Sequence, residues 1–206
     1  EGAIRGFLML ADAMQGPNQR NQEAIAITGI FDLGDRIFGK IRFEEPQKAS
    51  AEKPLSVNSS SRNSVSPVDF EYERSRNIIR SRLKSAVTVC LLAFLEGVQN
   101  EAIPQQMLQT VQWSAITHQL DQCFRLKDNS VAMDTQMIVK EGLNYYFLMK
   151  FLQPYDHGNS IIDPALKEHR LAVSFFEHKT GYVEISRHHR LERVLFQLPE
   201  NCAPGG

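Results

Sequence analysis

Residues 79–97, IRSRLKSAVTVCLLAFLEG, form the most strongly patterned stretch of the chain and decide its fold. Their apolar side chains fall on one wide stripe at helical spacing, which is typical of a helix that packs into a core. The stripe consists of Ile79, Leu83, Val87, Cys90, Leu91, Phe94 and Leu95. Gly97 suits the left-handed residue that ends many helices. This stretch therefore predicts a long core helix.

Helical spacing of apolar residues recurs on both sides of this stretch. It predicts helices over residues 4–14, 24–41, 103–113, 114–126, 137–152 and 163–178. Gly16 and Pro17 stop the first helix, and residues 18–22 form a polar turn. Asn100, Ser114 and Asp163 are the expected N-caps of three of the others. Successive helices with one apolar face predict a mainly α fold, either an armadillo-like α-solenoid or a plain helical bundle.

The period changes after Gly181, where apolar and polar residues alternate. Val183 and Ile185 mark one short strand, and Val194, Phe196 and Leu198 mark a second. Residues 187–190 would join them into a C-terminal β-hairpin. Because an isolated hairpin is marginal in water, we expect it to pack on the helices or on another chain.

The segment from Pro46 to Pro67 contains three prolines, a run of serines and no aromatic residue, which predicts a flexible linker. The expected organisation is therefore residues 1–44 as the end of a helical segment, 45–70 as linker, 71–152 as a second helical segment, and 153–206 as terminal helix and hairpin. Ser64 and Ser66 are accessible phosphorylation candidates, although such strings are common in disordered segments.

The chain has 206 residues, of which 42% are hydrophobic, and a formal net charge of -1. This composition is that of an ordinary globular protein and provides no charge that would recruit nucleic acid or anionic lipid. The three cysteines form no CxxC pair and are expected to be buried thiols. The longest apolar run, 86–95, is about half of the roughly 20 residues that a membrane span needs. A start at Glu1 suggests a piece of a longer protein.

Few residues suggest catalysis or a resident metal. Residues 34–40, GDRIFGK, match the start of a phosphate-binding loop, but Ile41 stands where Ser or Thr would bind Mg²⁺. The six histidines fall on separate elements apart from the adjacent His188 and His189, and hydrolase, zinc-protease and EF-hand motifs are absent. The basic group Arg74, Arg76, Arg80, Arg82 and Lys84 is expected to be a solvated helix face rather than an RNA groove. We therefore expect a protein that is not an enzyme.

Three blocks of the sequence resemble the inositol trisphosphate receptor and ryanodine receptor family of intracellular calcium-release channels. They are residues 10–17 (LADAMQGP) with the Asn and Gln residues that follow, residues 84–108 around LLAFLEG, and the paired segments YVEIS (182–186) and RLERVLF (190–196). The blocks occur in the family's order and cover most of the chain outside the linker.

The resemblance implies a position in the channel. It would be the end of the third armadillo solenoid, the RIH-associated region, running into the intervening lateral domain beneath the pore. It implies a non-catalytic coupling segment of a homotetrameric channel, on the cytosolic face of the endoplasmic reticulum membrane. Its partners would be other domains and subunits of the channel. The alternative is a free-standing armadillo-like scaffold that binds proteins through its helical face.

The resemblance also implies one regulatory ligand, Ca²⁺, bound only in the assembled channel. The family has a Glu ligand in the first block, and Asp12 occupies that position here, with Gln15 one helical turn later on the same face. The other ligands would lie outside these residues. The absence of an EF-hand insertion favours the inositol trisphosphate receptor type, whereas residues 191–196 are more similar to the ryanodine receptor hairpin.

Overall fold

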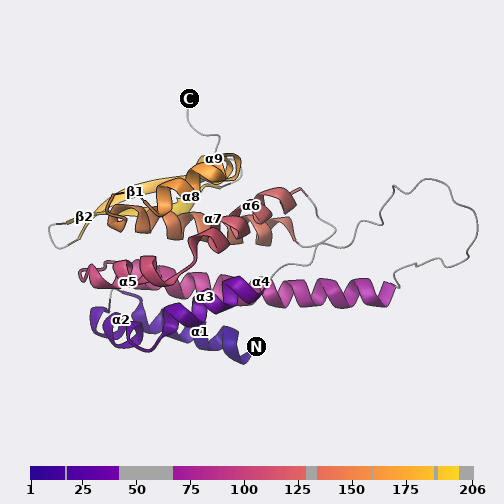
Figure 1. Ribbon diagram of the computed structural model, residues 1–206, viewed down its shortest axis with the longest axis horizontal. Helices are drawn as coiled ribbons and strands as arrows, with labels where there is room; N and C mark the ends of the chain where they lie inside the picture. Colours follow the sequence, from indigo (N-terminus) through magenta and orange to yellow (C-terminus); the bar gives the residue numbers. More distant parts are fainter. Residues whose placement is uncertain (17, 42–66, 129–133, 159, 188–189, 200–206) are drawn as a thin grey trace, which may run out of the picture.

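The computed structural model describes residues 1–206 except 17, 42–66, 129–133, 159, 188–189 and 200–206. The described chain is mainly helical and ends in a two-stranded antiparallel hairpin (Figure 1). The helices are α1 (Gly2–Met14), α2 (Gln19–Ala26), α3 (Ile30–Lys40), α4 (Pro67–Leu95), α5 (Ala102–Thr110), α6 (Trp113–Leu126), α7 (Thr135–Leu152), α8 (Ile162–Glu168) and α9 (Arg170–His178), and the strands are β1 (Thr180–Arg187) and β2 (Arg190–Gln197). None of the helices in this part of the chain is both long and apolar enough to cross a membrane.

Helix α4 is the central element, as the patterned stretch predicts. Helices α1 and α3 pack on one side of it, and α7 packs on the other, with α6, α8 and α9 beyond (Figure 1). Gly97 follows the helix at φ 58°, which confirms the predicted left-handed residue. Ile79 is an exception to the predicted stripe, because its side chain is exposed.

The N-terminal portion of α4 projects beyond the packed body (Figure 1). The helix begins at Pro67, so residues 67–70 are helical, whereas the sequence pattern assigns them to the linker. Proline is favoured in the first turn of a helix because its missing N–H would have no intrahelical partner there. The rest of the predicted linker, residues 45–66, lies outside the described residues.

Two short helices replace the single helix predicted over residues 24–41. The prediction of a polar turn over residues 18–22 is also wrong, because Asn18 caps α2 and its side chain accepts a hydrogen bond from the Asn21 N–H. Gly29 has φ 79° and separates α2 from α3, since this left-handed conformation cannot continue a right-handed helix. Gln22 holds α2 to the end of α4, where its Nε2 donates to the carbonyls of Ala93 and Glu96.

The boundary between α5 and α6 also differs from the prediction. Helix α5 ends at Thr110 instead of Trp113, and Trp113 begins α6 without the predicted Ser114 cap. The Gln112 N–H before α6 is bound instead by the carboxylate of Asp35 in α3. Asn100 does accept a hydrogen bond from the Ala102 N–H at the start of α5, although Glu101 is the N-cap residue.

The predicted terminal helix over residues 163–178 is divided into α8 and α9 at His169. The expected cap, Asp163, lies inside α8 and accepts a hydrogen bond from Gln153 instead. The capping is done by the buried Asp156, whose carboxylate accepts from the N–H groups of Ile161 and Ile162. A carboxylate six residues away in sequence is invisible to a search for local caps.

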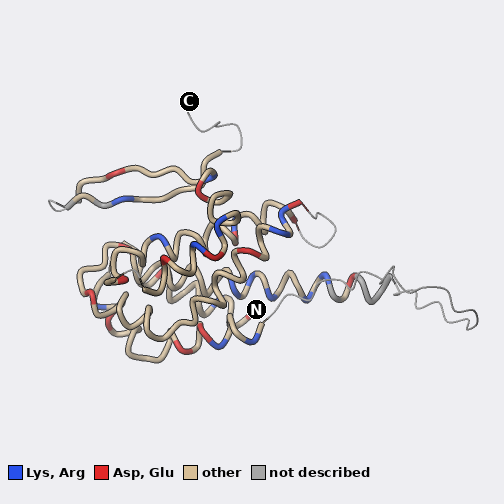
Figure 2. The backbone as a smooth tube through the Cα atoms, turned by 45° about the horizontal axis from the view of Figure 1, so that its top comes forward, with Lys and Arg blue, Asp and Glu red and all other residues tan. Residues whose placement is uncertain are grey.

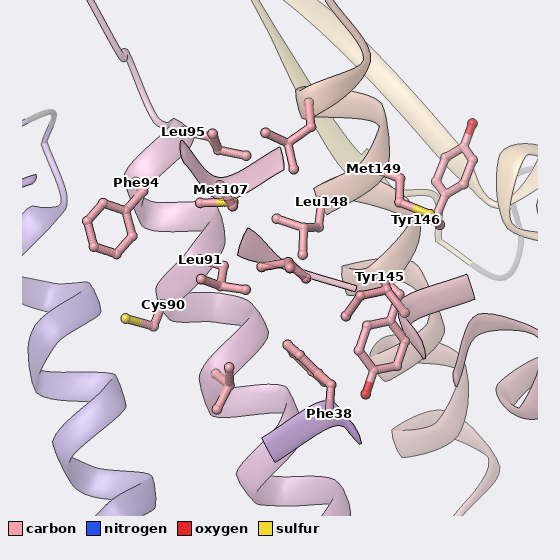
Figure 3. Close-up of a cluster of buried hydrophobic side chains, with 14 of the residues drawn as sticks. Phe38, Cys90, Leu91, Phe94, Leu95, Met107, Tyr145, Tyr146, Leu148 and Met149 are labelled. Atoms are coloured by element: carbon pink, nitrogen blue, oxygen red, sulfur yellow. The ribbon is translucent and has the colours of Figure 1, made fainter. Parts of the chain in front are cut away.

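The hydrophobic core lies between α4 and α7, with α3 and α5 closing it. Figure 3 shows Leu91 of α4, Met107 of α5 and Leu148 of α7 directed into one cluster, and Phe38 of α3 next to Tyr145. The ring centroids of Phe38 and Tyr145 are 6.1 Å apart in an edge-to-face arrangement. Cys90 and Cys123 are buried free thiols, as expected, and Cys202 lies outside the described residues.

Candidate functional site

Asp12 and Gln15, the residues predicted to contribute to a Ca²⁺ site, lie at the C-terminal end of α1 and are both exposed. Gln15 is the C-cap, and its backbone N–H donates to the Ala11 carbonyl at 3.1 Å. The turn that follows is fastened to the helix, because the Asn21 side chain donates to the Ala13 carbonyl at 2.7 Å. Asp12 is therefore presented to solvent from a well-fixed helix end.

This helix end has part of the chemistry that a Ca²⁺ ion requires. The carboxylate of Asp12 and the amide oxygen of Gln15 supply at most about three of the six to eight oxygens that Ca²⁺ takes. The C-terminal end of a helix also carries partial negative charge, which favours a cation. Within the described ranges, no group of three or more His, Cys, Asp and Glu side chains could hold a metal ion.

A second group of polar side chains lies inside the core between α4, α6 and α7. We call it the polar cluster, and it consists of Ser81, Lys84, Gln119, Glu141 and Tyr145. Lys84 is 0% exposed and Glu141 is 2% exposed. The Lys84 ammonium donates to Gln119 Oε1 at 2.6 Å, and the Tyr145 hydroxyl donates to Glu141 Oε1 at 2.6 Å. The Ser81 hydroxyl donates to the other Glu141 oxygen.

Burial moves both charged members of the polar cluster toward their neutral forms. It lowers the pKa of Lys84 from 10.5 to about 8, and the nearby Glu141 carboxylate opposes part of that change. Burial raises the pKa of Glu141, against the hydrogen bonds from Ser81 and Tyr145 and the charge of Lys84. The pKa of the Cys123 thiol is also raised by its burial.

The polar cluster shows where the sequence interpretation is wrong about individual charges. Lys84, which the sequence places with four arginines on a solvated helix face, is buried instead. Lys84 in fact shares the inward side of α4 with Val87 and Leu91, three and seven residues later. The sequence signal for this burial is a charged residue at a helical position that faces the core. Because neither Lys84 nor Glu141 reaches the surface, the cluster can join helices but cannot receive a substrate.

The predicted phosphate-loop match over residues 34–40 lies within α3. Its backbone N–H groups are engaged in a helix, so these residues form no phosphate-cradling loop. On α4, Arg74, Arg76 and Arg82 are exposed, in agreement with the expected solvated face. Figure 2 shows Lys and Arg positions recurring along the projecting part of this helix. His188 and His189 lie outside the described residues.

The hairpin exposes a large apolar surface. Tyr182, Val183, Leu191, Val194 and Phe196 are all exposed, and Leu191 reaches 75%. Val183 and Val194 are directly paired across the two strands, and Gly181 is paired with Phe196, so three of these side chains share one face. The hairpin continues α9 with almost no linker, and the Leu198 N–H donates to the Lys179 carbonyl at 2.9 Å.

Comparison of the chain with models of known protein families and with curated proteins finds no match.

Proposed function

We propose that this chain is a non-catalytic coupling segment of an intracellular ligand-gated calcium-release channel of the inositol trisphosphate and ryanodine receptor family. In this role it would transmit ligand-driven and Ca²⁺-driven movement from an armadillo-like solenoid toward the pore. It would work on the cytosolic face of the endoplasmic reticulum membrane, within a homotetramer. The observation that carries the proposal is a continuous series of packed elements from α1 to the hairpin.

This series begins at the helix that presents Asp12. Helix α1 packs along α4, α4 packs on α7, α7 packs on α9, and α9 contacts β1. Figure 1 shows α1 and the hairpin at opposite sides of the molecule. Close-packed helices transmit displacement because their interfaces have few voids to absorb it. Movement of α1 can therefore reach the hairpin through side-chain contacts alone.

The arrangement of the similar sequence blocks also supports the proposal. The first block includes the last turn of α1, residues 10–14, and the second block begins in α4, against which α1 packs. The third block forms the two strands of the hairpin. The exposed apolar face of that hairpin is suited to contact another domain or subunit, as a segment within a larger assembly requires.

The test uses the full-length channel reconstituted in a bilayer. We expect Asp12→Ala to shift activation by Ca²⁺ to higher concentration without preventing assembly, and Asp12→Glu, which restores the family residue, to retain or strengthen activation. Asp32→Ala, which removes an exposed carboxylate from α3, is the matched control and should leave activation unchanged. Unchanged activation in Asp12→Ala, with normal expression, would show that Asp12 is only a solvated side chain.

The alternative function is a free-standing armadillo-like scaffold that binds protein partners. It is favoured by the same exposed hairpin, which needs no channel to be useful. The open reading frame distinguishes the two functions. Several hydrophobic spans of roughly 20 residues soon after Cys202 would support the channel. A stop codon at Gly206 would support the scaffold.

A further inference from the structure

A groove of about 580 Å³ lies where the ends of α6, α9 and β2 meet the start of α7. This volume is within the range of about 300–1,000 Å³ that is usual for small-molecule sites. Its polar lining includes Lys127, Gln136, Lys140, Lys179 and Gln197, and Phe175 contributes an aromatic wall. The groove is remote in sequence from Asp12 and separate from the polar cluster.

Two of the three lysines are held in place by aromatic rings. The Lys127 ammonium lies 4.7 Å from the centroid of the Phe124 ring and 5.4 Å from that of Phe175. The Lys179 ammonium lies 5.2 Å from the same Phe175 centroid. Cation–π contacts of this kind orient an ammonium group that would otherwise rotate freely. One ring therefore gathers two positive charges at the groove wall.

The carboxylates around the groove do not balance these lysines. Asp128 is the acidic residue of the lining, and it pairs with Lys127 at 2.5 Å. Lys140 and Lys179 have no carboxylate partner within ion-pair distance among the described residues. The described lining therefore carries a net charge of +2, from three lysines and one aspartate, and an anion with two negative charges balances it better than a single carboxylate does.

We propose that this groove binds a small phosphomonoester with an apolar organic group. Its phosphate dianion would lie against Lys140 and Lys179, since ammonium groups bind phosphate as point charges from any direction. The amides of Gln136 and Gln197 are neutral hydrogen-bond donors for the remaining oxygens. Val139 and Leu198 offer apolar surface beside Phe175 for the organic group.

The experiment uses calorimetric titration of the 206-residue chain with phenyl phosphate as probe. We expect saturable binding that weakens roughly tenfold in Lys179→Met and in Lys140→Met, because each variant loses one ammonium contact. Lys167→Met removes an exposed lysine from α8 and is the matched control, with unchanged binding expected. Circular dichroism of each variant shows whether the helical fold is retained.

Two further ligands test the two parts of the ligand chemistry. Benzoate keeps the ring but carries a single charge, and inorganic phosphate keeps the charge but lacks the ring, so both should bind more weakly than phenyl phosphate. The proposal is overturned if phenyl phosphate does not bind, if Lys179→Met and Lys140→Met bind it as the original chain does, or if benzoate binds equally well. Equal binding of inorganic phosphate would overturn the role of the apolar wall.

Discussion

At the scale of single residues, the most consequential feature is the pair of charged side chains inside the core. Lys84 and Glu141 each lose hydration on folding, and each recovers part of that loss through hydrogen bonds from or to neighbouring helices. A buried charge network of this kind stabilises less than well-packed apolar residues would. It does restrict how α4, α6 and α7 can pack, since any other register would leave a charge unpaired.

The lowered pKa of Lys84 predicts a pH dependence of stability. Because the folded-state pKa is about 8 and the ordinary value is 10.5, the unfolded chain binds more protons between these values, so the contribution of Lys84 to the free energy of unfolding rises with pH. Relative to Lys84→Met, the original chain should gain roughly 2–3 kcal/mol from pH 7 to pH 10.5. Urea unfolding at a series of pH values measures this difference.

The other titratable groups of the core do not reverse the expected increase with pH in the stability of the original chain relative to Lys84→Met. The raised pKa values of Cys90, Cys123 and Tyr145 lower stability at alkaline pH in both proteins, so they largely cancel in the difference. Loss of Lys84 raises the pKa of Glu141 further, which makes the variant lose more stability as pH increases. Lys40→Met, at an exposed lysine, should follow the original chain at every pH. Parallel curves for Lys84→Met would contradict the prediction.

At the scale of elements, the packing of α7 on α9 depends on the absence of one side chain. A Cβ at Gly142 would meet the ring of Phe176, with ring carbons at 2.5 and 3.0 Å and one closer still. Phe176 is fully buried and its ring is 5.0 Å from that of Phe175, so it has no free space into which to move. The glycine therefore sets how closely these two helices approach.

We expect Gly142→Ala to lower the free energy of unfolding by roughly 1–3 kcal/mol, the usual cost of overpacking a core. Gly39→Ala is the matched control, because Gly39 is also helical but a Cβ there would meet no atom within 4 Å. That substitution should raise stability by roughly 0.5–1 kcal/mol through the higher helix propensity of alanine. Thermal unfolding followed by circular dichroism compares the two, and equal effects of both would refute the packing argument.

At the scale of the whole molecule, apolar side chains remain on two opposite surfaces. Met9 on α1 is 70% exposed, and Leu8 beside it is also exposed. The hairpin exposes Leu191 and Phe196 at the other side of the molecule. Apolar side chains exposed to water on two surfaces favour association with another chain or with a second copy of this one.

We predict that the isolated chain self-associates at micromolar concentration and that polar substitutions on the hairpin reduce this. Leu191→Lys combined with Val194→Thr should shift the sedimentation profile toward the monomer, because both side chains are exposed on the hairpin. Ile79→Thr, at an exposed position of α4, controls for the general loss of apolar surface. A monodisperse monomer with one sharp unfolding transition in the original chain would contradict this prediction. It would also contradict the proposal that the chain is a segment of a larger assembly.

The sequence by itself determined the elements whose signals are local. The spacing of apolar residues in α4, the positive-φ glycine at 97 and the alternation in the hairpin all depend on residues within one or two turns or along one strand. The predicted helix caps are wrong where the hydrogen-bond acceptor is distant in sequence, as with Asp156, which caps α8, and Asp35, which binds the start of α6. The positions of Asp12 and Gln15 on a helix end could likewise be predicted, because that end is marked by Gly16.

Only the tertiary structure decided which charges are buried and which surfaces come together. Lys84 and Glu141 are 57 positions apart in the chain, and they come together because α4 packs on α7. Of the three lysines of the groove, Lys127 follows α6, Lys140 lies in α7 and Lys179 follows α9, and no local pattern connects them. Helix periodicity shows which face of each element is apolar. Which faces then pack together depends on all side chains at once, and this packing determines where the polar cluster and the groove form.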